Sequence, residues 1–326
     1  MAKVSVLGAG GWGLALALVL HANQNDVTVW SPFVSEVNEL SKNRTNERLL
    51  KGVILPQDIK ITNNLSDIEE SAITVIATPS FAVRETAQRL KNIKNFGVVV
   101  NVSKGLEKLS LKRLSQVIAE ELPTAPLVIL SGPSHAEEVA RKIPTMLTAA
   151  SEDMDSAVMV QRVFSNEFLR VYTNTDVIGV ELGGALKNVI AVAAGLCDGM
   201  GLGDNSKAAL ITRGLTEMTR LGVKMGAQGA TFSGLTGLGD LIVTCTSQHS
   251  RNNRFGNLVG KGTSVQDALT EVGTVEGYYA CQMAFELSLK YGVYTPIITT
   301  CYELLYSDRP TKDIVKELMT RPFKEE

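Results

Sequence analysis

The sequence predicts an α/β domain followed by an all-α domain. Three observations lead to this fold class. Short apolar runs alternate with amphipathic stretches in the first half, a glycine-rich turn follows the first apolar run, and strand patterns fade after about residue 176. A chain of 326 residues is also long for one compact core. We therefore expect one domain at residues 1–176 and a second at 177–326.

The chain opens with a strand, a turn and a helix. Residues 3–7 read as a buried strand, and Gly8, Gly10 and Gly13 follow as GxGxxG before an apolar helical stretch. The first glycine of this pattern permits a tight turn, the second admits a pyrophosphate to the backbone, and the third lets helix and strand pack closely. The helix N-terminus adds N–H donors for phosphate. This segment predicts a Rossmann-type dinucleotide-binding domain.

The second strand, at residues 27–30, leaves the choice of dinucleotide open. NAD-binding domains usually carry an acid at the end of this strand, where it binds the ribose 2′-hydroxyl. Here Ser31, Pro32 and Phe33 follow the strand, and the first acid is Glu36. We expect Phe33 to pack near the adenine.

Later apolar runs extend the predicted sheet, at 72–77, 97–102, 127–130, 146–150 and 170–173. The first three runs end in turns at 78–80, 103–105 and 131–134. Ligands bind beyond the carboxyl ends of parallel strands, so these turns are expected to meet in one crevice with Lys104 at its edge.

The second half reads as helices, at 180–198, 205–225, 264–270, 275–291, 296–306 and 312–320. Lys187 lies near the start of an apolar run at 183–196 that is too short to span a membrane. A buried lysine is costly, and proteins tolerate it mostly as a base, a nucleophile or an anion ligand. The alternative is a lysine whose aliphatic side chain packs against apolar surface while its ammonium group stays in water. Gly183 and Gly184 are expected to leave room for a ligand.

Two later segments carry polar chemistry. The glycine-rich stretch 234–239 precedes Asp240, whose carboxylate suits a lysine ammonium, a substrate hydroxyl or a helix N-cap. Residues 244–254 read as a polar loop with Arg251 and Arg254, whose donors suit phosphate oxygens. A merely solvated loop is the alternative.

Composition argues against several classes of protein. A net charge of −2 is unlike that of a general nucleic-acid binder. The four cysteines form no CxxC pair and the three histidines have no ligand spacing, so no metal is assigned. No charged segment followed by an apolar signal region opens the chain, so we expect a cytoplasmic protein without membrane insertion.

Together, these motifs resemble the bacterial NAD(P)-dependent glycerol-3-phosphate dehydrogenases. The matching segments are GAGGWG (8–13), SKGLE (103–107), SGPSHAEEVA (131–140), ELGGALKN (181–188), GLGDL (237–241), SRN (250–252) and VEG (275–277). The resemblance covers nearly the whole chain. It implies interconversion of sn-glycerol 3-phosphate and dihydroxyacetone phosphate, which supplies glycerol phosphate for phospholipid synthesis.

The resemblance also implies residue roles. Lys187 would accept the proton of the C2 hydroxyl, with Lys104 and Asp240 around the reacting oxygen and Asn188 and Thr244 in support. The implied substrate residues are Lys104, Gly132, Ser134, Lys187, Asp240, Ser250, Arg251 and Asn252. The expected cofactor residues are Gly8, Gly10, Gly11, Trp12, Gly13, Phe33, Lys104, Ala136, Arg251, Thr274 and Glu276.

The resemblance favours NADPH over NADH, although many relatives carry Arg or His where this chain has Pro32. It further implies a small phosphorylated substrate and a homodimer. Two alternatives stay open. One is a β-hydroxyacid dehydrogenase or ketopantoate reductase-like enzyme, and the other is a non-catalytic dinucleotide sensor.

Overall fold

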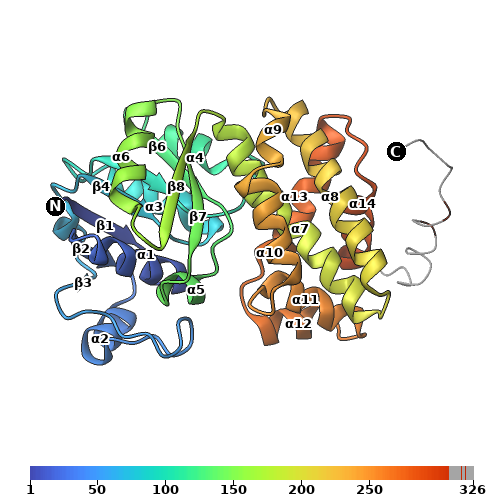
Figure 1. The fold of residues 1–326 in the computed structure, drawn as a ribbon, viewed down its shortest axis with the longest axis horizontal. Coiled ribbons are helices and arrows are strands. Elements are labelled where there is room, and N and C mark those ends of the chain that lie inside the picture. The colour runs from blue at the N-terminus through green and yellow to red at the C-terminus, as the bar shows by residue number, and fades with distance from the viewer. Residues whose placement is uncertain (308–316, 318–319, 321–326) are drawn as a thin grey trace. The chain divides into compact units, whose positions relative to one another are not determined.

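The chain forms two compact units, Met1–Glu181 and Leu182–Glu326. The computed structural model describes residues 1–307, 317 and 320, and the helix expected at 312–320 lies outside the described residues except for those two positions. The predicted fold class is confirmed, since an α/β unit precedes a helical one (Figure 1). The domain boundary expected at residue 176 stays a prediction. Helix α7 (Val177–Gly199) begins there, and the division between the units falls inside it.

The first unit is built on an eight-stranded sheet with the strand order β3-β2-β1-β4-β5-β6-β7-β8. The strands are β1 (Lys3–Leu7), β2 (Asp26–Trp30), β3 (Lys60–Thr62), β4 (Ile73–Ile76), β5 (Val98–Asn101), β6 (Leu127–Ser131), β7 (Thr145–Ala150) and β8 (Leu169–Asn174). All neighbours pair in parallel except β6 and β7, which are antiparallel. The short strand β3 was not predicted, because three residues give too little apolar pattern to read.

Helices cover both faces of this sheet. The helices α1 (Gly11–Ala22), α5 (Ala136–Ala140) and α6 (Met154–Phe164) share one apolar cluster with it. The helices α3 (Val83–Leu90) and α4 (Leu114–Glu121) share the other, while α2 (Val34–Asn43) follows β2. Burial on both faces explains why the central strands are apolar at nearly every position rather than at alternate ones.

The second unit continues α7 with helices connected by short turns. They are α8 (Asp204–Lys224), α9 (Gly229–Phe232), the π-helical turn η3 (Leu235–Gly239), α10 (Asp240–Thr246), α11 (Arg251–Gly260), α12 (Val265–Val272), α13 (Glu276–Lys290) and α14 (Pro296–Tyr306). The prediction of a polar loop at 244–254 is therefore wrong for most of this range. Its residues end α10 and begin α11, where the Ser250 hydroxyl accepts the N–H of Asn253 as an N-cap.

Close packing on α7 explains why this polar segment is helical. A Cβ added to Gly256 of α11 would lie 2.1 Å from the carbonyl oxygen of Val192, and one added to Gly195 would lie 2.1 Å from that of Asn253. The two helices therefore approach backbone to backbone, and tertiary contact overrides the weak helix propensity of the asparagines. Propensity alone does not reveal such contact.

Helix α7 is longer than the apolar run seen in the sequence. Among the described residues it is the one helix whose length and composition would allow it to cross a membrane, and 89% of its apolar window is buried within the protein. It is therefore a buried core helix of this protein. Its first turns are fixed within the first unit, where Glu181 accepts hydrogen bonds from Arg113 Nη1 (2.5 Å) and Ser115 N (2.7 Å). Burial raises the pKa of the Glu181 carboxyl, while the Arg113 charge opposes that rise.

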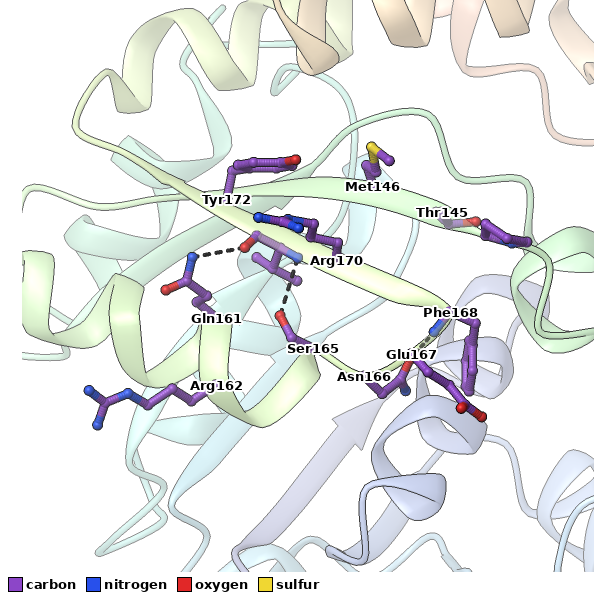
Figure 2. A pocket seen from close by; sticks show the side chains of 12 residues that line it. Thr145, Met146, Gln161, Arg162, Ser165, Asn166, Glu167, Phe168, Arg170 and Tyr172 are labelled. Atoms are coloured by element: carbon purple, nitrogen blue, oxygen red, sulfur yellow. Dashed lines mark hydrogen bonds between the residues drawn. The ribbon is translucent and has the colours of Figure 1, made fainter.

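The outer edge of the sheet, at β8, is closed by side chains and a loop residue. Leu169 N–H donates to Asn166 Oδ1 (2.7 Å), and the backbone N–H of Asn166 donates to Leu169 O (2.8 Å). Val171 N–H donates to Ser165 Oγ (3.2 Å) and Val171 O accepts from Gln161 Nε2 (2.8 Å), as Figure 2 shows. An open strand edge invites pairing with another chain, and these contacts block it.

A hollow of about 570 Å³ lies beside this edge, lined by residues of β7, α6 and β8 and the turns that join them (Figure 2). The described residues that line it include none of the predicted site residues. The hollow therefore belongs to the edge of the sheet rather than to the crevice expected from the sequence.

The edge contacts predict a measurable effect on stability and association. Replacing Gln161 and Ser165 together by Ala removes two hydrogen bonds to Val171. We expect a loss of about 1–3 kcal/mol in urea unfolding and more light scattering on concentration. Arg162→Ala, an exposed neighbour on α6, is the control and is expected to change neither. Wild-type stability and scattering in the double variant would show that the edge is protected in another way.

Candidate functional site

Lys187 is the centre of a buried polar cluster in the second unit. This residue of α7 is only 5% exposed, and its ammonium donates to Asp240 Oδ1 and to Thr244 Oγ1 (2.8 Å). Asp240 and Thr244 lie one turn apart on α10 and are 1% and 5% exposed. The Thr244 hydroxyl also donates to the Asp240 carbonyl (2.5 Å). Of the partners that the sequence left open for the Asp240 carboxylate, the structure shows the lysine ammonium.

The cluster suits proton transfer better than covalent chemistry. A buried ammonium held by a carboxylate and a hydroxyl has a fixed direction, and the carboxylate compensates its charge. The thiol of Cys245 follows Thr244 on α10, but burial raises its pKa to about 12 even though the Lys187 charge opposes that rise. It stays a neutral thiol near neutral pH and is a poor nucleophile.

Asn188, beside Lys187, belongs to a second junction. Asn252 of α11 donates through Nδ2 to Asn188 Oδ1 (2.9 Å) and accepts the N–H of Gly277 through its own Oδ1 (2.9 Å). A Cβ on Gly277 would lie 2.5 Å from the Asn188 carbonyl oxygen, so α13 begins against the backbone of α7. The motifs ending in Asn188, Asn252 and Gly277 are thus brought together.

Gly183, one turn before Lys187, has a different role from the one expected. A Cβ on Gly183 would lie 2.7 Å from the Thr236 carbonyl oxygen, so the backbone of η3 fills the space proposed for a ligand. A Cβ added to Gly237 would likewise lie 2.0 Å from the carbonyl oxygen of Phe232. The expectation of ligand room at Gly183 is therefore wrong. These glycines let η3 pack against α7 and deliver Asp240 to Lys187.

The glycine turn of the first unit fits a dinucleotide phosphate. Gly8 has φ +120°, and a Cβ on Gly13 would lie 2.0 Å from the Gly8 carbonyl oxygen. At Gly10 an added Cβ would meet nothing within 4 Å, so open space lies over the N-terminus of α1. The indole Nε1 of Trp12 is buried without a hydrogen-bond partner among the described residues. The N–H groups at the start of α1 and the indole N–H of Trp12 are donors suited to an anion bound over this turn.

Three strand-end turns of the same unit meet at Lys104. Lys104 Nζ donates to Gly132 O (2.9 Å) and lies 3.4 Å from Ser134 Oγ, which joins the turns after β5 and β6. Ser103 Oγ donates to Thr78 O (2.5 Å) and adds the turn after β4. The convergence expected from the sequence is confirmed.

Two exposed phenylalanines flank the glycine turn. Phe33 follows β2 and is 65% exposed, and Phe81 follows β4 and is 71% exposed. Both strands are direct neighbours of β1 in the sheet. Sequence reasoning named Phe33 but missed Phe81, although an aromatic residue just after a central strand was a usable signal. Exposed rings in this place suit stacking on a flat base.

The remaining predicted residues lie at the ends of elements. Gly11 begins α1, Ala136 begins α5, Arg251 begins α11 and Glu276 begins α13. Ser250 caps α11 and is buried, whereas Arg251 and Thr274 are exposed. The first unit thus carries the residues expected to bind a dinucleotide, and the second carries the Lys187 cluster.

Comparison with known proteins agrees with both halves of this description. The family model for the N-terminus of NAD-dependent glycerol-3-phosphate dehydrogenase matches residues 3–157, and the model for its C-terminus matches residues 176–316. A relative from Lysinibacillus sphaericus, named glycerol-3-phosphate dehydrogenase (NAD(P)+), is 51% identical over 100% of this chain and 98% of its own length.

Solved structures show the same likeness. Glycerol-3-phosphate dehydrogenase from Coxiella burnetii has a TM-score of 0.94 at 38% identity, covering 98% of this chain and 99% of that one. A ketopantoate reductase from Ralstonia eutropha has a TM-score of 0.59 at 12% identity, covering 97% and 99% of the two chains. This second likeness shows a shared fold alone.

The glycine turn predicts a contrast between two alanine variants. Gly13→Ala forces the Gly8 backbone to move, so we expect a loss of about 1–3 kcal/mol in urea unfolding. Gly10→Ala adds a methyl group to open space at φ −70°, so its stability should stay within about 0.5 kcal/mol of wild type. Equal losses in the two variants would contradict the packing described for this turn.

Proposed function

This chain belongs to the NAD-dependent glycerol-3-phosphate dehydrogenase family, and we propose that Lys187 is the proton donor and acceptor of its reaction. The enzyme is an NAD(P)-dependent oxidoreductase that acts on a CH–OH group. The observation that carries the proposal is the burial of the Lys187 ammonium against Asp240 and Thr244. A charge this costly to bury is retained mostly where it does chemistry.

The proposed reaction interconverts sn-glycerol 3-phosphate and dihydroxyacetone phosphate. Bound NAD(P)H supplies a hydride from the nicotinamide C4. In reduction, Lys187 gives a proton to the C2 oxygen of the ketone as that carbon gains its hydrogen. In oxidation, neutral Lys187 takes the hydroxyl proton. While it is charged, the ammonium also stabilises the negative charge that develops on the oxygen.

Asp240 and Thr244 are proposed to aim the Lys187 ammonium. The carboxylate compensates the buried charge, and the hydroxyl accepts a second hydrogen bond from Nζ (2.8 Å). Because both partners come from one turn of α10, they fix the direction of Nζ together. Asn188 is held by Asn252 and supports the same segment of α7.

The phosphate and the cofactor are assigned to the remaining motif residues. We propose that the substrate is held by Lys104, Gly132, Ser134, Ser250, Arg251 and Asn252. We propose that the dinucleotide is held by Gly8, Gly10, Gly11, Trp12, Gly13, Phe33, Phe81, Lys104, Ala136, Arg251, Thr274 and Glu276. The open space at Gly10 and the buried Trp12 donor support the second assignment. The guanidinium fork of Arg251 supports the first.

The setting of the enzyme is also proposed from the family. We propose a cytoplasmic homodimer that works mainly in the reductive direction and supplies glycerol phosphate for phospholipid synthesis. The alternatives from the sequence have less support. The ketopantoate reductase likeness extends to the fold alone, and a dinucleotide sensor has no use for a buried proton donor.

The activity itself is tested by absorbance at 340 nm. We expect dihydroxyacetone phosphate to drive oxidation of the reduced dinucleotide at neutral pH, with glycerol 3-phosphate and inorganic phosphate as competitors. Ketopantoate, which lacks the phosphate, is the control substrate and is expected to give no turnover. Turnover of ketopantoate, or of neither substrate by folded protein, would contradict the proposal.

The role of Lys187 is tested with a pair of variants. Lys187→Met alone leaves the Asp240 carboxylate buried without its partner and is expected to cost stability, so it is combined with Asp240→Asn. We expect the double variant to unfold near wild type but to lose turnover about a thousandfold. The control is Lys207→Met, which removes a lysine paired to Asp198 at 2.7 Å and is expected to keep its turnover. Wild-type kcat in the double variant would remove Lys187 from the mechanism.

A further inference from the structure

A carboxylate lies at the end of β2, although the first acid in the sequence after this strand is Glu36. Ser31 directly follows β2 and donates its hydroxyl hydrogen to Glu36 Oε2. The same hydroxyl oxygen accepts the N–H of Phe33 (3.3 Å). The chain thus turns back on itself after β2, and Glu36 reaches the strand end although it lies six residues beyond Trp30.

The position of Glu36 is fixed by helix α2. The helix begins at Val34, so Glu36 lies in its first turn, where the helix dipole favours a negative charge. Val37 and Leu40 of the same helix are buried and hold it against the first unit. Glu36 itself is partly exposed, and its carboxylate can accept further hydrogen bonds beside the one from Ser31.

In dinucleotide-binding domains the end of the second strand faces the 2′ position of the adenosine ribose. We propose that Glu36 makes this enzyme select NAD(H) over NADP(H). The carboxylate accepts a hydrogen bond from a ribose 2′-hydroxyl and repels a 2′-phosphate. The proposal rests on the dinucleotide site of the proposed function and deepens it, because the family resemblance by itself favoured NADPH.

Three basic side chains of the neighbouring elements have acceptors of their own. Arg89 of α3 pairs with Glu85 (2.7 Å), and Lys60 of β3 pairs with Asp67 (2.8 Å). Arg44, at the end of α2, donates to backbone carbonyl oxygens of the loop before β3 (2.9 and 2.7 Å). Arg89 also lies over the ring of Trp30, 5.7 Å from its centroid. Each of these three cations already has a protein acceptor, whereas binding a 2′-phosphate calls for cations directed at it.

Equilibrium binding of the two reduced dinucleotides tests the proposal. Titration is followed by nicotinamide fluorescence, without substrate. We expect wild-type protein to bind NADH about 10- to 100-fold more tightly than NADPH, the factor associated with one hydrogen bond to a charged group. In Glu36→Gln, which removes the charge and keeps the shape, NADPH should bind more tightly and the preference should fall to about threefold or less.

The matched control is Glu39→Gln, which removes the same charge from an exposed position one turn further along α2. It is expected to keep the wild-type preference. Equal binding of NADH and NADPH by wild-type protein would overturn the proposal, and so would an unchanged preference in Glu36→Gln.

These outcomes are separate from the test of the enzymatic activity. A protein that binds NADH selectively but does not reduce dihydroxyacetone phosphate would overturn the proposed function and leave the role of Glu36 standing. A protein that reduces this substrate but binds both dinucleotides equally would overturn the role of Glu36 and leave the proposed function standing.

Discussion

The buried positive charge of Lys187 is the constraint on which the architecture of the second unit depends. An ammonium that is 5% exposed must meet a counter-charge, because an unpaired buried ion costs several kcal/mol, about 3–5 when a partner is removed. Asp240 supplies that charge from α10, and α10 reaches α7 only because η3 packs backbone to backbone at Gly183. The glycines before Asp240 are therefore explained by packing, because they let η3 approach α7 and so position Asp240 beside Lys187.

Glycine has two different uses in this chain, and the sequence pattern does not separate them. At Gly10 the missing Cβ leaves open space for a ligand, whereas at Gly183 and Gly195 the space is filled by another stretch of backbone. The first kind could be predicted, because GxGxxG sits between a strand and a helix. The second kind was mistaken for ligand room at Gly183, since only the packed structure shows which backbone comes close.

The same limit explains what else the sequence could and could not predict. Seven strands and the core helix α7 followed from apolar runs. For the Asp240 carboxylate, a lysine ammonium was one of three partners that the sequence left open. Strand β3 was too short to read, and α11 was taken for a loop because tertiary contact outweighs the propensities of its asparagines. The hydrogen bond from Ser31 to Glu36 depends on how the chain turns after β2, so the acid at the strand end went unrecognised.

The central claim is that Lys187 exchanges its proton with the C2 oxygen of the substrate. A crystal structure of the unreactive complex with NAD+ and dihydroxyacetone phosphate tests it most directly. The account predicts that Lys187 Nζ lies within hydrogen-bond reach of the ketone oxygen, about 2.6–3.2 Å, while its contacts with Asp240 and Thr244 persist. A ketone oxygen held by other donors, with Lys187 bound to its protein partners alone, would contradict it.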